Sequence, residues 1–203
     1  MINRIVIFLF ILASTDLAIA ADSRGGLFLE PAITYESGET DVNYPSPLSN
    51  STGESTGLGL GARIGFHISE AFFLAFDGRY SKPQFKDSSV SYDEMADSMN
   101  WGPVIGMQMP HFGIRIWGTY VMGGSLDPEN AGNFDIKFKN AKGYRVGLGF
   151  LLEVVSLNVE YENLSYDSAE LQKVGPFSSV GDFNGVDLDN NSWIVSVSFP
   201  MSL

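Results

Sequence analysis

Three neighbouring side chains carry the groups that acyl-transfer chemistry requires. His67 and Ser69 flank a single residue, and Glu70 follows directly. An imidazole can act as general base, a serine hydroxyl as nucleophile, and a carboxylate can orient the imidazole ring. However, a three-residue spacing is common by chance, and neighbouring residues in one short polar segment rarely converge. We therefore interpret His67, Ser69 and Glu70 as turn residues and predict no catalytic residue.

Oxygen ligands for a divalent cation gather near the C-terminus. Asp182, Asn184, Asp187 and Asp189 follow one another closely, with Gly185 among them. A calcium loop of the EF-hand type needs glycine at its sixth position and glutamate at its twelfth, and here the glycine comes fourth and no glutamate follows. The pattern predicts a solvated acidic loop, with loose calcium binding as the open alternative. We predict no specific metal or cofactor site.

Other ionisable residues lie at every second position within segments that otherwise alternate apolar and small residues. Four arginines occur inside these segments, whereas all six lysines occur between them. Because the arginine fork can satisfy several carboxylates in a confined polar space, this partition predicts an ionic network inside the protein. The predicted members are Glu30, Arg63, Asp77, Arg79, Arg115, Arg145, Glu160 and Glu162.

The alternating segments predict eight strands with two different faces, because successive strand residues point to opposite sides. Tight turns and long polar segments alternate between them, which predicts an antiparallel meander. The two prolines Pro31 and Pro103 fall inside strands, which indicates either local bulges or a different strand register at these positions. The predicted strands are residues 26–36, 56–67, 71–81, 100–109, 112–121, 143–152, 155–163 and 191–203, and the predicted long loops are 37–55, 82–99, 122–142 and 164–190.

A tyrosine or tryptophan closes one end of the apolar row in seven strands, next to a long polar loop. Phenylalanine occupies the other end of several rows. Rings with a polar tip at the edge of an apolar face are typical of a membrane–water interface. The predicted interface aromatics are Tyr35, Tyr80, Trp101, Tyr120, Tyr144, Tyr161 and Trp193.

A closed barrel with this pattern is either a soluble ligand-binding cup with its apolar row inside, or a membrane barrel with that row facing lipid. The confinement of arginines to the polar row favours the membrane barrel. The strands also have the length needed to cross a bilayer at a tilt. Eight strands enclose an interior that side chains just fill. The fold class predicted is an all-β, closed eight-stranded antiparallel up-and-down transmembrane β-barrel.

The ends of the chain and its composition predict an exported protein. Residues 1–20 have a positive start, a short apolar run and a small-x-small cleavage motif, which predicts a signal peptide followed by a barrel domain at residues 21–203. The 203-residue chain has no cysteine and a formal net charge of −12. This acidic balance argues against nucleic acid as a partner.

The whole mature chain resembles the eight-stranded outer-membrane barrels of the OmpA/OmpX type. The resemblance lies in its architecture and in the alternating final segment, residues 193–203. It implies that the barrel-insertion machinery reads this segment, although the chain ends in Leu203 where the family commonly has an aromatic residue. It also implies the outer membrane of a Gram-negative bacterium, periplasmic termini and extracellular long loops.

We expect a monomer with a packed interior and a structural or surface-interaction role through four long acidic loops. Lys137, Lys139 and Lys142 are expected to meet lipopolysaccharide head groups, and outer-membrane lipid is the general partner. The alternation of Phe134, Ile136 and Phe138 predicts that the wall continues above the membrane there. Two alternatives stay open. One is a narrow pore, and the other is a lipid A-modifying enzyme, whose His-x-Ser pair the residues at 67 and 69 resemble.

Overall fold

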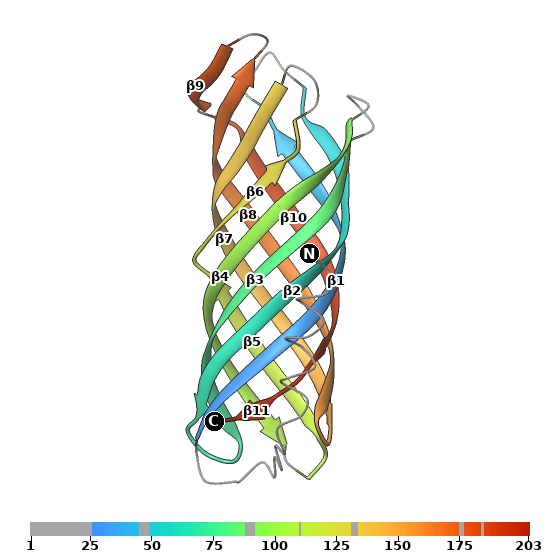
Figure 1. Cartoon of the computed structure of the whole chain (residues 1–203), viewed down its shortest axis with the longest axis vertical. Coiled ribbons are helices and arrows are strands. Elements are labelled where there is room, and N and C mark those ends of the chain that lie inside the picture. Colours follow the sequence, from blue (N-terminus) through green and yellow to red (C-terminus); the bar gives the residue numbers. More distant parts are fainter. Residues whose placement is uncertain are drawn as a thin grey trace, which may run out of the picture.

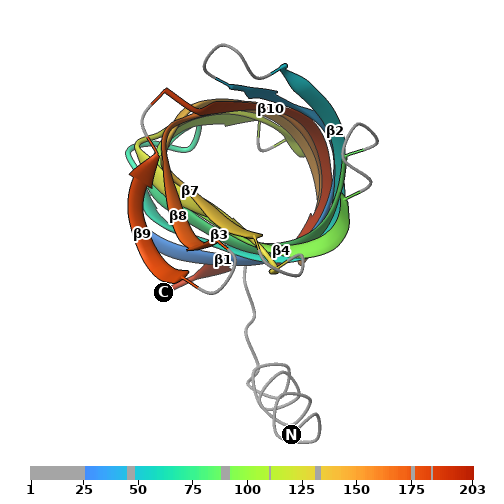
Figure 2. The same ribbon diagram turned by 90° about the horizontal axis from the view of Figure 1, so that it is seen from above.

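The computed structural model describes residues 26–44, 49–87, 92–109, 111–130, 134–174, 177–183 and 185–203. They form a tall barrel of strongly tilted strands (Figure 1), and the view along its axis shows a closed ring (Figure 2). No helix within these ranges is long and apolar enough to cross a membrane. The predicted signal peptide lies outside the described residues.

Eight antiparallel strands make the ring, and β1 closes it by pairing with β10. The fifth strand of the ring consists of β5 and β6, with one residue between them. The short β9 continues one wall beside β8, and β11 pairs with the start of β1. The strands are β1 Leu27–Asn43, β2 Ser51–His67, β3 Phe72–Asp87, β4 Tyr92–Met109, β5 Ile114–Val121, β6 Gly123–Pro128, β7 Phe134–Leu152, β8 Val155–Val174, β9 Phe177–Phe183, β10 Asp187–Ser198 and β11 Met201–Ser202.

This topology confirms the predicted fold class. A closed ring has no free edge, so the backbone hydrogen-bonding groups of each wall strand find partners on both sides. That satisfaction is what permits a sheet to cross hydrocarbon.

The prediction of four long loops is wrong. β1 runs to Asn43 and β2 starts at Ser51, so most of the segment 37–55 belongs to the wall. β3, β4, β7 and β8 likewise extend far into the segments predicted as loops, with β7 starting at Phe134. The outward apolar row of each strand ends at the aromatic residues, although the strand itself continues.

Beyond the aromatic residues the apolar side chains change faces while the strand continues. In β1, Ile33 and Tyr35 face outwards and are about half exposed, whereas the outward residues Glu39 and Asp41 further along are charged. The inward residue Val42 is buried. We call the part of the wall between the interface aromatics and the short turns the lower barrel, and the part beyond the aromatics the extension. The lower barrel has an apolar exterior. The extension has an apolar interior, as a water-soluble protein does.

The two strand prolines have different consequences. Opposite Pro103 the register between β4 and the fifth strand changes by one residue, from Val104↔Thr119 to Trp101↔Gly123, which is the predicted bulge. Near Pro31 the prediction of a bulge is wrong, because β1 keeps one register along β2. The ladder from β1 to the last strand is interrupted at Pro31, which lies opposite Phe199 and next to Pro200, between β10 and β11, and the register is the same on both sides of the gap.

Candidate functional site

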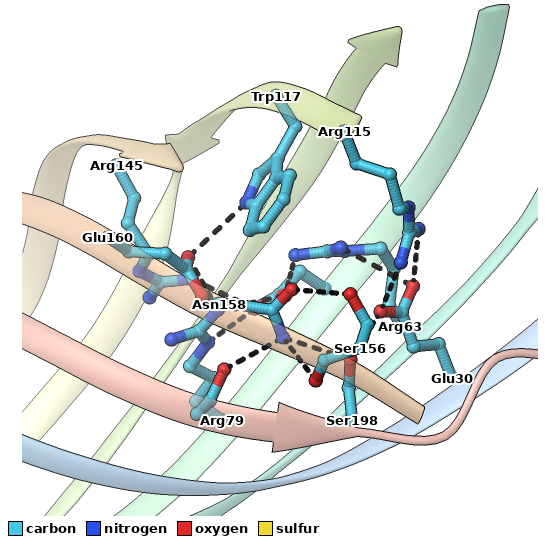
Figure 3. Close-up of polar contacts among 12 residues, drawn as sticks. Glu30, Arg63, Arg79, Arg115, Trp117, Arg145, Ser156, Asn158, Glu160 and Ser198 are labelled. Atoms are coloured by element: carbon cyan, nitrogen blue, oxygen red, sulfur yellow. Dashed lines mark hydrogen bonds and ion pairs between the residues drawn. The ribbon is translucent and has the colours of Figure 1, made fainter. Parts of the chain in front are cut away.

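The lumen at the height of the lower barrel contains the predicted ionic residues, and Figure 3 shows how Glu30, Glu160 and the four arginines face one another. Glu30 on β1 accepts two hydrogen bonds from Arg115 on β5, at 2.7 and 2.8 Å. It also pairs with Arg63 of the neighbouring β2 at 3.5 Å. Ser198 donates to the same carboxylate at 2.7 Å. The buried Glu30 thus joins strands from both sides of the barrel.

Asp77 on β3 is the carboxylate of the network that pairs with the most arginines. It receives Arg63 at 3.3 Å, Arg79 at 3.1 Å and Arg145 at 2.9 Å. Arg79 also donates to Glu160 at 2.7 Å, and the Nε of Arg145 donates to Glu162 at 2.8 Å. The eight predicted residues therefore form one connected set of ion pairs across the lumen.

Several residues of this layer are uncharged, and the charge pattern of the sequence does not predict them as members of the network. Trp117 lies in the lumen, where its Nε1 donates to Glu160 at 3.3 Å and its ring contacts the Arg63 guanidinium at 4.8 Å (Figure 3). Asn158 donates to Ser196 and Ser198. Their position in the inward row could have identified them, since inward residues of a narrow barrel must pack together.

The layer is filled almost completely. The cavity bordered by Glu30, Arg79, Asn158 and Glu160 has a volume of about 10 Å³, roughly the space of one water molecule. The Nε of Arg63 and Nη1 of Arg79, both bordering residues, have no hydrogen-bond partner among the described residues.

Two apolar clusters cap the ionic layer within the lumen. The lower cluster consists of Phe28, Phe73, Val104 and Trp117. Glycines leave room for its rings, because a Cβ on Gly106 would meet Phe73 at 2.1 Å and one on Gly147 would meet Trp117 at 2.3 Å. The upper cluster, here called the apolar plug, consists of Val42, Phe85, Ala96, Val121, Leu126, Ile136, Phe138, Ala141, Leu164, Tyr166, Ala169, Val186 and Leu188.

The predicted interface aromatics lie on the outer face of the wall. Each is at least partly exposed, and Tyr161 contacts both Tyr144 and Trp193, at centroid distances of 6.5 and 5.3 Å. A band of exposed apolar side chains separates them from the phenylalanines at the other end of the strands. Those phenylalanines are Phe66, Phe72, Phe112, Phe150 and Phe199.

The turn after β2 does not assemble the acyl-transfer geometry. The Ser69 hydroxyl oxygen accepts from the backbone N–H groups of Ala71 and Phe72, both at 3.3 Å. The His67 ring contacts Phe28 and Phe73, and its Nδ1 has no hydrogen-bond partner within the described chain. The structure therefore gives Ser69 a turn-stabilising role.

The C-terminal acidic residues belong mainly to strands. Asp182 lies on β9 and Asp187 and Asp189 lie on β10, while Asn184 falls outside the described residues. Within the part of the chain that the structure describes, no group of three or more histidine or acidic residues could hold a metal ion.

The three lysines expected to meet lipopolysaccharide lie on the outer face of β7. Lys137 pairs with Asp127 at 2.7 Å and Lys142 with Asp167 at 2.6 Å, and Lys139 pairs with Glu170. Hydrogen bonds to these carboxylates raise the pKa of Lys139 and of Lys142. Both amines therefore stay protonated at neutral pH.

Comparisons with known proteins reveal a likeness of fold. No family model matches the chain, and no curated protein matches its sequence. The outer membrane protein OprG from Pseudomonas aeruginosa aligns over 89% of this chain and 98% of its own, with a TM-score of 0.54 and 10% identity. Neisserial surface protein A aligns over 85% and 96%, with a TM-score of 0.42 and 14% identity. The likeness to OprG supports the fold of an outer-membrane β-barrel.

Proposed function

We propose that this protein is a monomeric integral barrel of the outer membrane whose lumen is closed and whose strand-built extension projects from the membrane for surface interactions. The termini would lie on the periplasmic side and the extension outside the cell. The final strands β10 and β11 would carry the segment read by the insertion machinery. Among the described residues, the eight-stranded ring that would span the membrane has no free strand edge for a second copy, which supports the monomer.

The observation that carries the closed lumen is the stack of three filled layers along it. The lower aromatic cluster and the apolar plug lie on either side of the ionic network. Opening a pore would require breaking ion pairs in a confined space and removing buried apolar side chains such as Phe138 and Leu188. Both costs oppose conduction, so we favour the structural role over the pore.

The membrane location is supported by the change of apolar face at the aromatic residues. Below them the exposed residues of β2 include Leu58, Leu60 and Ile64, each more than half exposed. Exposed apolar area of this extent is costly in water. Above them the outer face is polar, as expected for a wall that has left the hydrocarbon.

A surface-interaction role is supported by the acidic outer face of the extension on β10, β1 and β2. Asp41 lies directly opposite Asp189, and Glu39 lies directly opposite Glu54. Like charges opposite each other on a sheet destabilise it. Folding does not require these opposed pairs, which supports a role of the extension outside folding.

Single-channel recording on the refolded protein in planar bilayers tests the closed lumen. We expect no conductance steps under conditions in which a general porin, recorded in the same bilayers, gives open channels. Stable, reproducible steps from the wild-type chain would contradict the proposal and establish the pore instead.

A further inference from the structure

The outer wall has a groove of about 570 Å³ where the fifth strand and β7 separate. β5 and β7 pair up to Val121↔Gly143, and β6 and β7 resume pairing at Ser125↔Lys139. The fifth strand has its extra residue at this height, and Asn140 of β7 adopts a left-handed backbone with φ 59°. Two adjacent irregularities therefore interrupt the ladder and create the groove.

The lining of the groove is basic along one side. Lys137, Lys139 and Lys142 line it, and among the residues that the structure describes no acidic residue does. The carboxylates that pair with these lysines lie outside the lining, on the neighbouring strands. Each ammonium group has three donors, so pairing with one carboxylate leaves donors available for an anion.

The other side of the groove is apolar and continues into the lipid-facing band. Trp101 and Met122 line it, and both side chains are exposed. A Cβ on Gly123 would meet the Trp101 ring at 2.6 Å, so the absence of a side chain there lets the indole lie flat against the wall. The groove thus presents cationic groups above an apolar surface, at the height of the interface aromatics.

We propose that this groove binds a membrane lipid whose phosphate head group carries a net negative charge, with the phosphate at the three lysines and the chain along Trp101 and Met122. This inference rests on the proposed membrane location. The ligand is taken as a lipid because the apolar side of the groove is continuous with the membrane-facing band, whereas a free phosphate ion would make no use of it.

The test uses tryptophan quenching by brominated lipids in vesicles of phosphatidylcholine. In a Trp193→Phe background, the groove residue Trp101 is the exposed reporter, since Trp117 is buried in the lumen. We expect brominated phosphatidic acid to quench Trp101 with at least about five-fold preference over brominated phosphatidylcholine, as one lysine near an anionic lipid contributes about 1 kcal/mol. A Trp101→Phe variant, with Trp193 as reporter, should show no such preference.

Six lysines in the chain allow a control of equal charge. The triple variant Lys137→Gln, Lys139→Gln, Lys142→Gln should lose the preference at Trp101. The matched variant Lys82→Gln, Lys86→Gln, Lys173→Gln, which removes the lysines outside the groove, should keep it. Equal loss in both variants would overturn the site in favour of general electrostatic attraction.

Two further results would overturn the proposal in distinguishable ways. Inorganic phosphate at millimolar concentration should leave the preference unchanged, and complete loss of the preference would show that the lysines recognise phosphate alone and that the apolar side contributes nothing. Failure of every brominated lipid to quench Trp193 would contradict the membrane location itself. Quenching of Trp193 without any preference at Trp101 would overturn the lipid site alone.

Discussion

Arg145 on β7 and Asp77 on β3 join two strands that are not neighbours in the ring, through an Nη1–Oδ1 contact of 2.9 Å across the lumen. Arg145 is fully buried, and Asp77 also receives Arg63 and Arg79. The barrel wall is therefore cross-braced from inside, in addition to its backbone ladder. The predictions below test this bracing, the packing around it and the change of faces along the wall.

Removal of Arg115 tests the ionic network. Arg115→Ala leaves the buried Glu30 without its two shortest contacts with arginine, so the free energy of unfolding should fall by about 3–5 kcal/mol. Urea unfolding of the refolded protein in lipid vesicles measures this. The double variant Arg115→Ala, Glu30→Ala should lose less than the two single losses combined, because no buried carboxylate remains unpaired. Unchanged stability of Arg115→Ala would contradict the network.

A methyl group added at Gly147 tests the packing of Trp117. The new Cβ would lie 2.3 Å from the indole, which must shift away from Glu160 and Arg63, so Gly147→Ala should destabilise by about 1–3 kcal/mol. Gly118→Ala is the matched control, because nothing lies within 4 Å of that Cβ. Equal stability of the two variants, measured by the same unfolding assay, would show that the ring is not confined.

Truncation within the apolar plug tests whether the extension is a folded part of the barrel. Phe138 is 2% exposed on the inner face of β7, so Phe138→Ala should cost about 3–5 kcal/mol. The neighbouring outward residue provides the control, and Lys139→Ala should change stability by less than about 1 kcal/mol. A neutral Phe138→Ala would mean that the extension does not unfold together with the lower barrel.

An arginine placed on the outer face tests where the hydrocarbon ends. Ala62 lies outward in the middle of the apolar band of β2, so Ala62→Arg should destabilise by about 2–4 kcal/mol. Thr52 is outward and exposed on the extension of the same strand, and Thr52→Arg should be close to neutral. Similar costs at both positions, in vesicle unfolding, would contradict the proposed membrane boundary.

Neutralisation of one acidic partner tests the opposed charges on the extension. Asp41 faces Asp189 directly, so Asp189→Asn should stabilise the barrel by about 0.2–1 kcal/mol at low salt. The gain should shrink in high salt, because exposed charges are screened. No gain at low salt would show that the two carboxylates do not repel each other measurably.

The sequence by itself determined the strand faces of the lower barrel, and with them the closed eight-stranded fold. An alternating row with aromatic ends and arginines in the opposite row is local information, because every second residue shares a face. The same local rule holds above the aromatic residues of β1, where Val42 continues the inward row, whereas in β7 the alternation shifts by one residue at Asn140, so that Phe138 faces inward. Beyond the aromatic residues the inward side chains are apolar and the outward side chains are polar. A strand of this kind looks like a polar loop when only the outward apolar row is considered.

Tertiary structure alone decided which side chains meet. The eight charged residues share a lumen by their row, but the connection of Asp77 to three arginines depends on how far each strand is staggered against its neighbours. Trp117 lies among them because Gly147 and Gly149 have no side chain that would occupy the space of its ring. The lysine groove required two irregularities on adjacent strands at one height. Stagger and ring closure are long-range relations between strands, and the local alternation of residues does not contain them.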